Sequence, residues 1–542
     1  MNKLTPIQNK ILGLSKLFST AESLTDNTPL KTQIHRYIFL AGLVGVGVGM
    51  PLSNGLNSIA QAILAINWVI EENYTQKYKS FIRNKPAVVL CSFYIMHLLG
   101  LLYTTNFNYG MEDINKKLPL LLFPLVFSTS KPLLEKEKRT VILIFMLAVT
   151  YATLAGGYLL INHEIVDIHD ISIYIAPVRL AMMMTLSIFL LGHYVVTNKL
   201  SFWSIIYTIW ICWLLFFLFV MQSLTAVVMV LIICLALLLY IAIKAIRIKK
   251  MLAGLSVIGL FALGSIGSTG YIVYSYHHYF PNPDTVDFSK LDKQTINGNN
   301  YDIDTQNIYT ENGHYVAEYV CLKELKKEWN KRSKIPFDSN DLKGNAVQST
   351  LIRYMTSMGL RKDSAGVSVL SPKDMNAIEM GIPNYHFNSL SSMNYRLYQV
   401  FWEVDNYQRG GDINGHSVTM RLEYWRVALT LISRHPLIGV GTGNVREAFD
   451  NYYDSTHSVL TKQWRLRAHE QYLEIGVGFG LVGIAWFIFS LLYPGIKTKK
   501  IFTYFYFIFW MIFMLSLFTE DTLETEAGAT FYAFFNSFFL FL

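Results

Sequence analysis

The sequence predicts an all-α fold, a polytopic membrane helix bundle of about twelve transmembrane helices with one large, mainly helical loop domain. Composition is the first reason, since 52% of the 542 residues are hydrophobic and only 15% are charged. Soluble domains carry about 25% charged residues. The second reason is that apolar runs recur along the chain, many of them close to the roughly 20 residues that a helix needs to span a bilayer. Helical periodicity inside the one long polar stretch is the third.

Twelve apolar runs account for the expected membrane helices. The first 35 residues are polar and basic without a short apolar core, so we expect a retained N-terminal segment, 1–35, and no signal peptide. The fourth run is the shortest, and Lys116, Lys117 and Pro119 at its start lead us to expect a half-interfacial helix. The runs are 36–51, 55–72, 86–104, 117–130, 140–162, 175–197, 202–220, 223–244, 251–275, 469–492, 501–518 and 526–542.

Loop charge predicts the orientation of these helices. Basic residues gather in short loops, where the positive-inside rule favours the cytoplasm. They include Lys77, Lys79, Arg83, Lys85, Lys131, Lys136, Lys138, Arg139, Lys244, Arg247, Lys249, Lys250, Lys497, Lys499 and Lys500. The opposite side carries Glu164, Asp167, Asp170, Glu520, Asp521, Glu524 and Glu526. Both termini are therefore expected in the cytoplasm, and the net charge of +8 is explained by topology, without nucleic-acid binding.

The polar stretch 276–468 falls on the outer side and is too long for an ordinary connection. Helical periodicity over 346–360, 391–408 and 419–434 predicts a folded domain, whereas 281–312 is rich in Asn, Asp and Thr and is expected to be irregular. The expected division is a cytoplasmic segment 1–35, nine helices in 36–275, the loop domain 276–468 and three helices in 469–542.

A histidine and an arginine stand where the polar and apolar parts meet. His469 lies at the junction of the loop domain and the tenth apolar run, and imidazole exchanges a proton near neutral pH. Arg179 lies in the first turns of the sixth expected helix. Arginines within membrane helices are costly and are usually functional or paired. Snorkelling of Arg179 toward the headgroups is the alternative interpretation.

Arg421 begins an amphipathic helix that ends at His435 and Pro436, because proline cannot continue a helix. An ion pair between Arg421 and Glu403 or Glu423 is the alternative to a binding role. The glycine-rich loop 439–443 follows, and Asn444 with Glu447 resembles a capping box that opens another short helix. Free amides there would suit a phosphate, although a plain turn is equally consistent with these glycines.

Further residues are secondary candidates for binding the anion: Lys116, Lys117, Arg353, Arg361, His435 and Asn444. For Arg353 and Arg361 the alternative is a solvated cation in an exposed loop. Headgroup contact is the simpler expectation for Arg465 and Arg467. No metal site is predicted, because the thirteen histidines show no metal-ligand spacing and Leu473 stands where a zinc-protease motif after His469-Glu470 needs a second histidine. The four cysteines form neither a disulfide framework nor a CxxC pair.

At these residues the chain resembles the O-antigen ligase and O-antigen polymerase superfamily, bacterial inner-membrane glycosyltransferases of the GT-C type. The pattern R-x-x-x-W is present at Arg421–Trp425, H-P-L-x-G-x-G-x-G-N at His435–Asn444, and H-x-x-Y-L at His469–Leu473 ahead of Phe-Gly-Leu-Val-Gly483. Segments 350–363, 414–419, 177–179 and 520–528 are similar too, so the resemblance covers most of the chain. One departure is Glu470, where the family often has Asn.

The resemblance implies transfer of a glycan from undecaprenyl diphosphate to an acceptor hydroxyl, with inversion and without a nucleotide, metal or other cofactor. It implies that His469 is the base and that Arg179 and Arg421 bind the diphosphate. The implied place is the bacterial inner membrane, with the active site facing the periplasm. The implied partners are the lipid-linked donor, lipid A core or another hydroxyl acceptor, and membrane lipids.

Three functions remain open at this stage. The first is an O-antigen ligase that acts on lipid A core. The second is a polysaccharide polymerase or protein O-oligosaccharyltransferase of the same superfamily. The third is a lipid-linked glycan transporter, although transporters often show internal repeats and we find none in the sequence.

Overall fold

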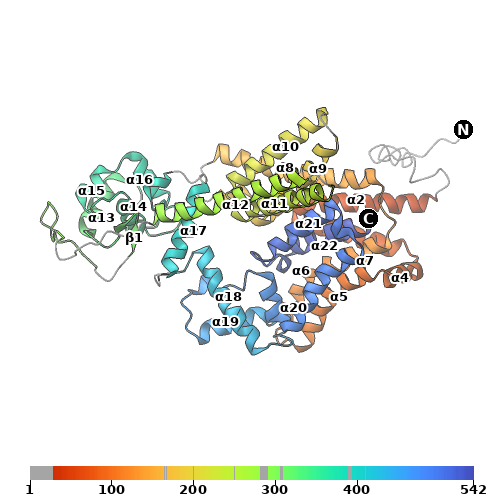
Figure 1. Ribbon diagram of the computed structural model, residues 1–542. Helices are drawn as coiled ribbons and strands as arrows, with labels where there is room; N and C mark the ends of the chain where they lie inside the picture. Colours follow the sequence, from red (N-terminus) through yellow and green to blue (C-terminus); the bar gives the residue numbers. More distant parts are fainter. Residues whose placement is uncertain are drawn as a thin grey trace, which may run out of the picture.

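The computed structural model describes residues 29–163, 165, 168–198, 201–248, 251–280, 291–304, 309–388, 393–408 and 411–542. Most of these residues are helical (Figure 1). A small antiparallel hairpin pairs β1 (Thr310–Glu311) with β2 (His314–Tyr315), and Thr310 lies opposite Tyr315. The predicted all-α class is therefore confirmed. The expected loop charges Glu164, Asp167, Lys249 and Lys250 lie outside the described residues.

Each of the twelve expected apolar runs is a helix. They are α2 (Leu30–Leu52), α3 (Asn54–Ile70), α5 (Lys85–Gly100), α7 (Pro119–Thr129), α8 (Glu135–Asn162), α9 (Pro177–Thr197), α10 (Phe202–Val220), α11 (Leu224–Arg247), α12 (Met251–Tyr279), α20 (Gln471–Lys497), α21 (Tyr504–Ser516) and α22 (Glu526–Phe541). Among the described residues, eight are long and apolar enough to cross a membrane: α2, α5 with its 3-10 extension, α8 to α12, and α20. The others, α3, α7, α21 and α22, have fewer than 18 residues.

The membrane helices share one apolar core, to which the described residues of α12 do not belong, and α22 lies deep within it. Helix α22 is buried along nearly its whole length and packs on α7 and α21. Phe513 of α21 stacks on Tyr532 of α22 with ring centroids 4.1 Å apart. Helix α20 packs against α5, so the segment after His469 enters the bundle directly. The short helices α4 (Tyr74–Arg83) and α6 (Phe107–Lys117) connect longer ones.

The segment between α12 and α20, here called the insert (280–470), forms two further apolar cores. Helices α14 (Val347–Ser357), α17 (Met393–Gln408) and α18 (Ser417–Arg434) confirm the three predicted helical stretches. The remaining helices are α13 (Leu322–Arg332), α15 (Ser364–Val369), α16 (Pro372–Glu379) and α19 (Val445–Ser455). Figure 1 shows α13 to α16 at the end far from the bundle, whereas α18 and α19 return to α20. Residues 281–290 and 305–308 of the expected irregular start lie outside the described residues.

Candidate active site

His469 is held at the entrance of α20 by an unusual backbone. Its φ is 48°, a left-handed conformation that few non-glycine residues adopt. The next residue, Glu470, caps α20, because its carboxylate accepts a hydrogen bond from the backbone N–H of Leu473 at 2.6 Å. The His469 side chain is 32% exposed. Its ring lies 5.9 Å from the ring of Tyr424 on α18. Such strain in a non-glycine residue is typical of functional positions.

Asp521 faces this imidazole from the turn between α21 and α22. Its Oδ1 lies 3.7 Å from His469 Nδ1, slightly longer than an ordinary hydrogen bond. The Asp521 carboxylate raises the pKa of His469, against the opposing effect of burial. A carboxylate next to Nδ1 stabilises the imidazolium and leaves Nε2 as the nitrogen that can exchange a proton with another molecule.

Arg421 lies one turn into α18 and reaches the same turn. Its guanidinium donates to Glu520 at 3.0 Å, and its side chain is 32% exposed. The alternative of an ion pair is therefore met, but the partner is Glu520, and the two carboxylates named from the sequence have other contacts. Glu423 pairs with Arg426 at 2.6 Å, and Glu403 accepts from the backbone N–H of Val418 at 2.7 Å. Arg421 is thus tied to the turn that also faces His469.

Arg179 approaches the cluster from the N-terminus of α9. Its Nε is buried and has no hydrogen-bond partner within the described ranges. Burial raises the pKa of the Glu520 carboxyl, while the positive charges of Arg421, His469 and Arg179 oppose that rise. Arg179 therefore lies close enough to Glu520 to act on its charge. The structure brings Arg421 and His469 together at the turn of Glu520 and Asp521, and the charge of Arg179 acts on the same turn.

A buried ionic network continues from this turn into the bundle. Lys117 at the end of α6 is 1% exposed and lies 2.8 Å from Glu524 and 2.5 Å from Asp113. Glu524 also faces Arg467 at 3.2 Å. Arg467 reaches Asp521 at 3.4 Å and, on α20, Glu474 at 2.7 Å. Burial by itself would raise the pKa of Glu524, but Lys117 and Arg467 together lower it below the usual range.

This network changes two expectations. Lys117 does converge on the site, but buried carboxylates surround its ammonium group, so it is an internal counter-ion. Arg467 does not simply contact headgroups, because three carboxylates share its guanidinium. By contrast, Lys116 is exposed.

Arg353 and Arg361 are engaged within the insert. Arg353 donates to Glu311 at 2.6 Å and lies 4.0 Å above the ring of Trp402. Arg361 pairs with Asp292 at 2.5 Å. Arg353 is therefore part of the folded insert, where the sequence suggested a solvated loop cation. Neither arginine has a contact with His469 among those that the structure describes.

The glycine-rich loop binds α20, and four of its five backbone amides, those of 439–442, donate to protein carbonyls and are not free for phosphate. Helix α20 is broken at Gly480, whose φ is 64°. Residues 436–441, which run into this loop, supply the missing partners: Val440 N–H donates to the Val477 carbonyl at 2.9 Å, and Leu481 N–H donates to the Pro436 carbonyl at 2.8 Å. The bonds from Gly441 to Gly478 (2.9 Å) and from Val482 to Leu437 (3.3 Å) complete this arrangement. These residues thus provide hydrogen-bond partners for backbone groups of α20 that the break leaves without a partner inside the helix.

The predicted capping box at Asn444 and Glu447 is wrong. Asn444 precedes α19, but its side chain makes no capping bond. Its Oδ1 instead accepts from the backbone N–H groups of Thr105 and Asn106 at 3.0 and 3.1 Å, and from the hydroxyl of Thr104 at 2.9 Å. Asn444 therefore fastens the loop to the segment after α5. His435 ends α18, and its side chain is exposed.

Residues 384–488 match the O-antigen ligase family model. The match confirms the family resemblance that the motifs predicted. Among the curated proteins compared with the chain, none matches it significantly. The O-antigen ligase segment contains α17, α18, α19 and most of α20, and so includes Arg421, His435, Asn444 and His469.

Several charged residues of the site lie outside the O-antigen ligase segment and come from distant parts of the chain. Arg179 and Lys117 precede it, whereas Glu520, Asp521 and Glu524 follow it. Sequence reasoning placed this acidic turn on the same membrane side as His469 but assigned it no role. The sequence does contain a signal for this role. The three carboxylates follow an apolar run directly, on the membrane side where the candidate cations are expected, and could balance their charge.

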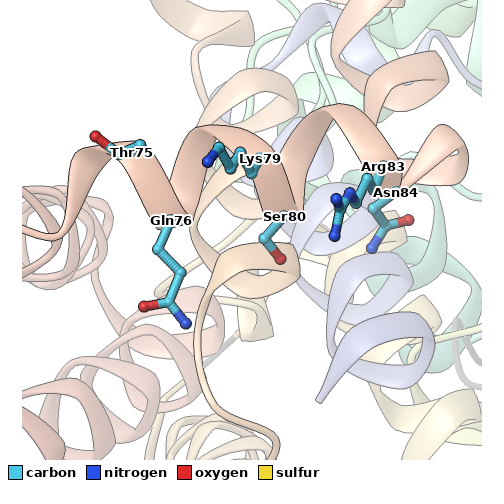
Figure 2. A pocket seen from close by; sticks show the side chains of 6 residues that line it. All are labelled: Thr75, Gln76, Lys79, Ser80, Arg83 and Asn84. Carbon is cyan, nitrogen blue, oxygen red and sulfur yellow. The ribbon is translucent and has the colours of Figure 1, made fainter.

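Two other features bear on the chemistry of the candidate site. His469, Glu520 and Asp521 each offer one potential metal-ligand atom, and these atoms lie within 4.8 Å of one another. Arg421 and Arg467 already neutralise the two carboxylates, which disfavours a further cation there. A cavity of about 710 Å³ lies along α4 (Figure 2), but its side chains, which include Lys79 and Arg83, belong to a different part of the bundle.

Proposed function

We propose that the chain is a glycosyltransferase that moves a glycan from undecaprenyl diphosphate to an acceptor hydroxyl, most simply a sugar of lipid A core. The observation that carries this proposal is that Arg421 pairs with Glu520 and His469 faces Asp521 in one turn, on which the charge of Arg179 also acts. The O-antigen ligase match and the membrane bundle support the same class of substrate. The proposed place is the inner membrane, with 276–468 and the active site in the periplasm and both termini in the cytoplasm.

In the proposed reaction, His469 is the base. Its imidazole takes the proton of the acceptor hydroxyl, while the oxygen attacks the anomeric carbon and the bond from that carbon to the diphosphate breaks. Attack opposite the leaving group inverts the anomeric centre. Asp521 stabilises the imidazolium that forms, since its carboxylate lies 3.7 Å from Nδ1.

Two guanidinium groups would stabilise the diphosphate that leaves. Negative charge grows on its oxygens in the transition state, and fixed cations in a partly buried site act on that charge strongly. Arg421 is held by Glu520 and half exposed, so a diphosphate can share or replace this carboxylate partner. The buried Nε of Arg179 has no partner among the described residues and offers a donor for a phosphate oxygen. We propose that these charges make a metal ion unnecessary.

The decisive experiment compares His469→Ala with His435→Gln in purified protein. The assay measures transfer of a glycan from a polyprenyl-diphosphate donor to an acceptor in detergent. We expect His469→Ala to abolish transfer with little change in thermal stability, because the partly exposed His469 side chain makes only a long contact to Asp521 and a ring contact to Tyr424. His435→Gln should retain transfer, because that side chain is exposed at the end of α18. Transfer by a folded His469→Ala protein would exclude His469 as the base.

The acceptor distinguishes the members of this superfamily. A lipopolysaccharide gel of a strain lacking the protein separates them: core without glycan indicates a ligase, core with one repeat a polymerase, and loss of glycoproteins a protein O-oligosaccharyltransferase. The transporter alternative makes a different prediction, since a protein that only moves the lipid-linked glycan would catalyse no transfer when purified.

A further inference from the structure

A second site lies at the opposite end of the membrane helices from His469. The start of α8, the end of α9, the start of α21 and the end of α22 surround a cavity of about 450 Å³. The turn that faces His469 joins the other ends of α21 and α22. The 13 residues of α21 rise about 20 Å along the helix axis, so the cavity is distinct from the candidate active site.

The walls of this cavity combine cations with aromatic rings. Lys138, Arg139 and Lys500 line it, whereas Glu135 is the one carboxylate side chain among the lining residues. Glu135 is 90% exposed and lies 2.7 Å from Lys138. Within the described residues no carboxylate pairs with Arg139 or Lys500. The cavity therefore carries an excess of positive charge.

Arg139 is oriented by aromatic residues and retains free donors. Its guanidinium lies 5.1 Å above the ring of Tyr194 and donates to the hydroxyl of Tyr207 at 3.2 Å. A guanidinium has five N–H donors, and this contact uses one. Tyr504 and Phe505 add apolar ring surface to the cavity wall. The arrangement offers a charged end for a phosphate and an aromatic wall for hydrocarbon.

We propose that this cavity binds one anionic phospholipid, with its phosphodiester at Arg139 and Lys500 and its acyl chains against the aromatic wall. Charge complementarity favours an anionic headgroup, and the position at the ends of membrane helices gives a lipid direct access. Tyrosine and basic residues between helix ends are the usual composition of an interfacial headgroup site. A free phosphate shares the headgroup chemistry but would make no use of the rings.

Native mass spectrometry of the full-length protein in detergent tests this proposal, with phosphatidylglycerol as the probe. The variants are Lys500→Gln and Arg139→Gln/Lys500→Gln. Each lost cation near a headgroup weakens binding about fivefold, so we expect roughly a 30-fold loss for the double variant. Lys500→Gln alone keeps the proposal testable if Arg139→Gln harms packing at Tyr194. Glycan transfer should persist in both variants.

The matched control is Lys136→Gln/Lys497→Gln, which removes two exposed cations that do not line the cavity. It should bind phosphatidylglycerol like the unaltered protein. An equal loss in this control would reveal general surface attraction and overturn the proposal. So would equal binding of zwitterionic phosphatidylcholine, or displacement of the lipid by millimolar inorganic phosphate, which would indicate a phosphate site.

Discussion

Glu524 offers the sharpest test of the buried ionic network. Glu524→Gln preserves the shape of the side chain but removes the charge that faces Lys117 at 2.8 Å and Arg467 at 3.2 Å. Removing one partner from a buried ion pair usually costs about 3–5 kcal/mol. Lys117 keeps Asp113, and Arg467 keeps Glu474, so the lower end of this range applies. We expect a loss of about 3 kcal/mol, or roughly a hundredfold in the folding equilibrium.

The assay is unfolding in detergent at pH 7, followed by tryptophan fluorescence. The folded pKa of Glu524 lies below its unfolded value near 4.5, so its stabilisation is complete above that pH and is lost as the pH falls through the folded pKa. Glu526→Gln is the matched control, because Glu526 accepts from the Ser58 hydroxyl at 2.6 Å and pairs with no described cation. Equal stability of the two variants would refute the network.

The other predictions concern the base His469, the break in α20 at Gly480, the hydrogen bonds that Asn444 accepts, and metal dependence. Asp521→Asn lowers the pKa of His469, so the acid limb of the kcat/KM profile should move to lower pH; an unchanged limb would contradict the pairing. Gly480→Ala places a Cβ 2.4 Å from the Leu437 backbone at positive φ and should lower the melting temperature sharply, whereas Gly264→Ala, with open space around it, should not. Asn444→Ala should cost about 2 kcal/mol in the same unfolding assay, since two backbone amides lose their acceptor. Chelation of divalent ions should leave transfer unchanged, and loss of activity restored by one metal would contradict the proposed role of the arginines.

Local patterns predicted the helices well, because hydrophobic runs and helical periodicity report on each segment alone. Three of the seven helices of the insert, α14, α17 and α18, and the twelve apolar helices follow from such patterns. The number that can cross a membrane is harder to predict, since α22 is apolar but has 16 residues and is buried inside the bundle. Hydropathy does not distinguish a lipid-facing helix from one covered by protein.

The site was predictable only in part, and the reason is distance along the chain. His469, Arg421 and Arg179 stood out by type and position, yet their partners Asp521 and Glu520 come from another turn. Asn444 shows the same limit, since a local capping rule pointed to Glu447. The actual partners, 104–106, lie about 340 residues earlier in the chain. They donate hydrogen bonds to the Asn444 side chain, which is therefore not available to cap α19.

The hydrogen bonds between residues 436–441 and α20 affect how the parts of the site can move. Helix α18 carries Arg421, α20 follows His469, and backbone bonds on both sides of Gly480 tie one to the other. These two elements should therefore move as one rigid block, with a nearly constant separation between guanidinium and imidazole. Arg179 stands on α9, which these bonds do not include, so its distance from the other two side chains is not fixed in the same way.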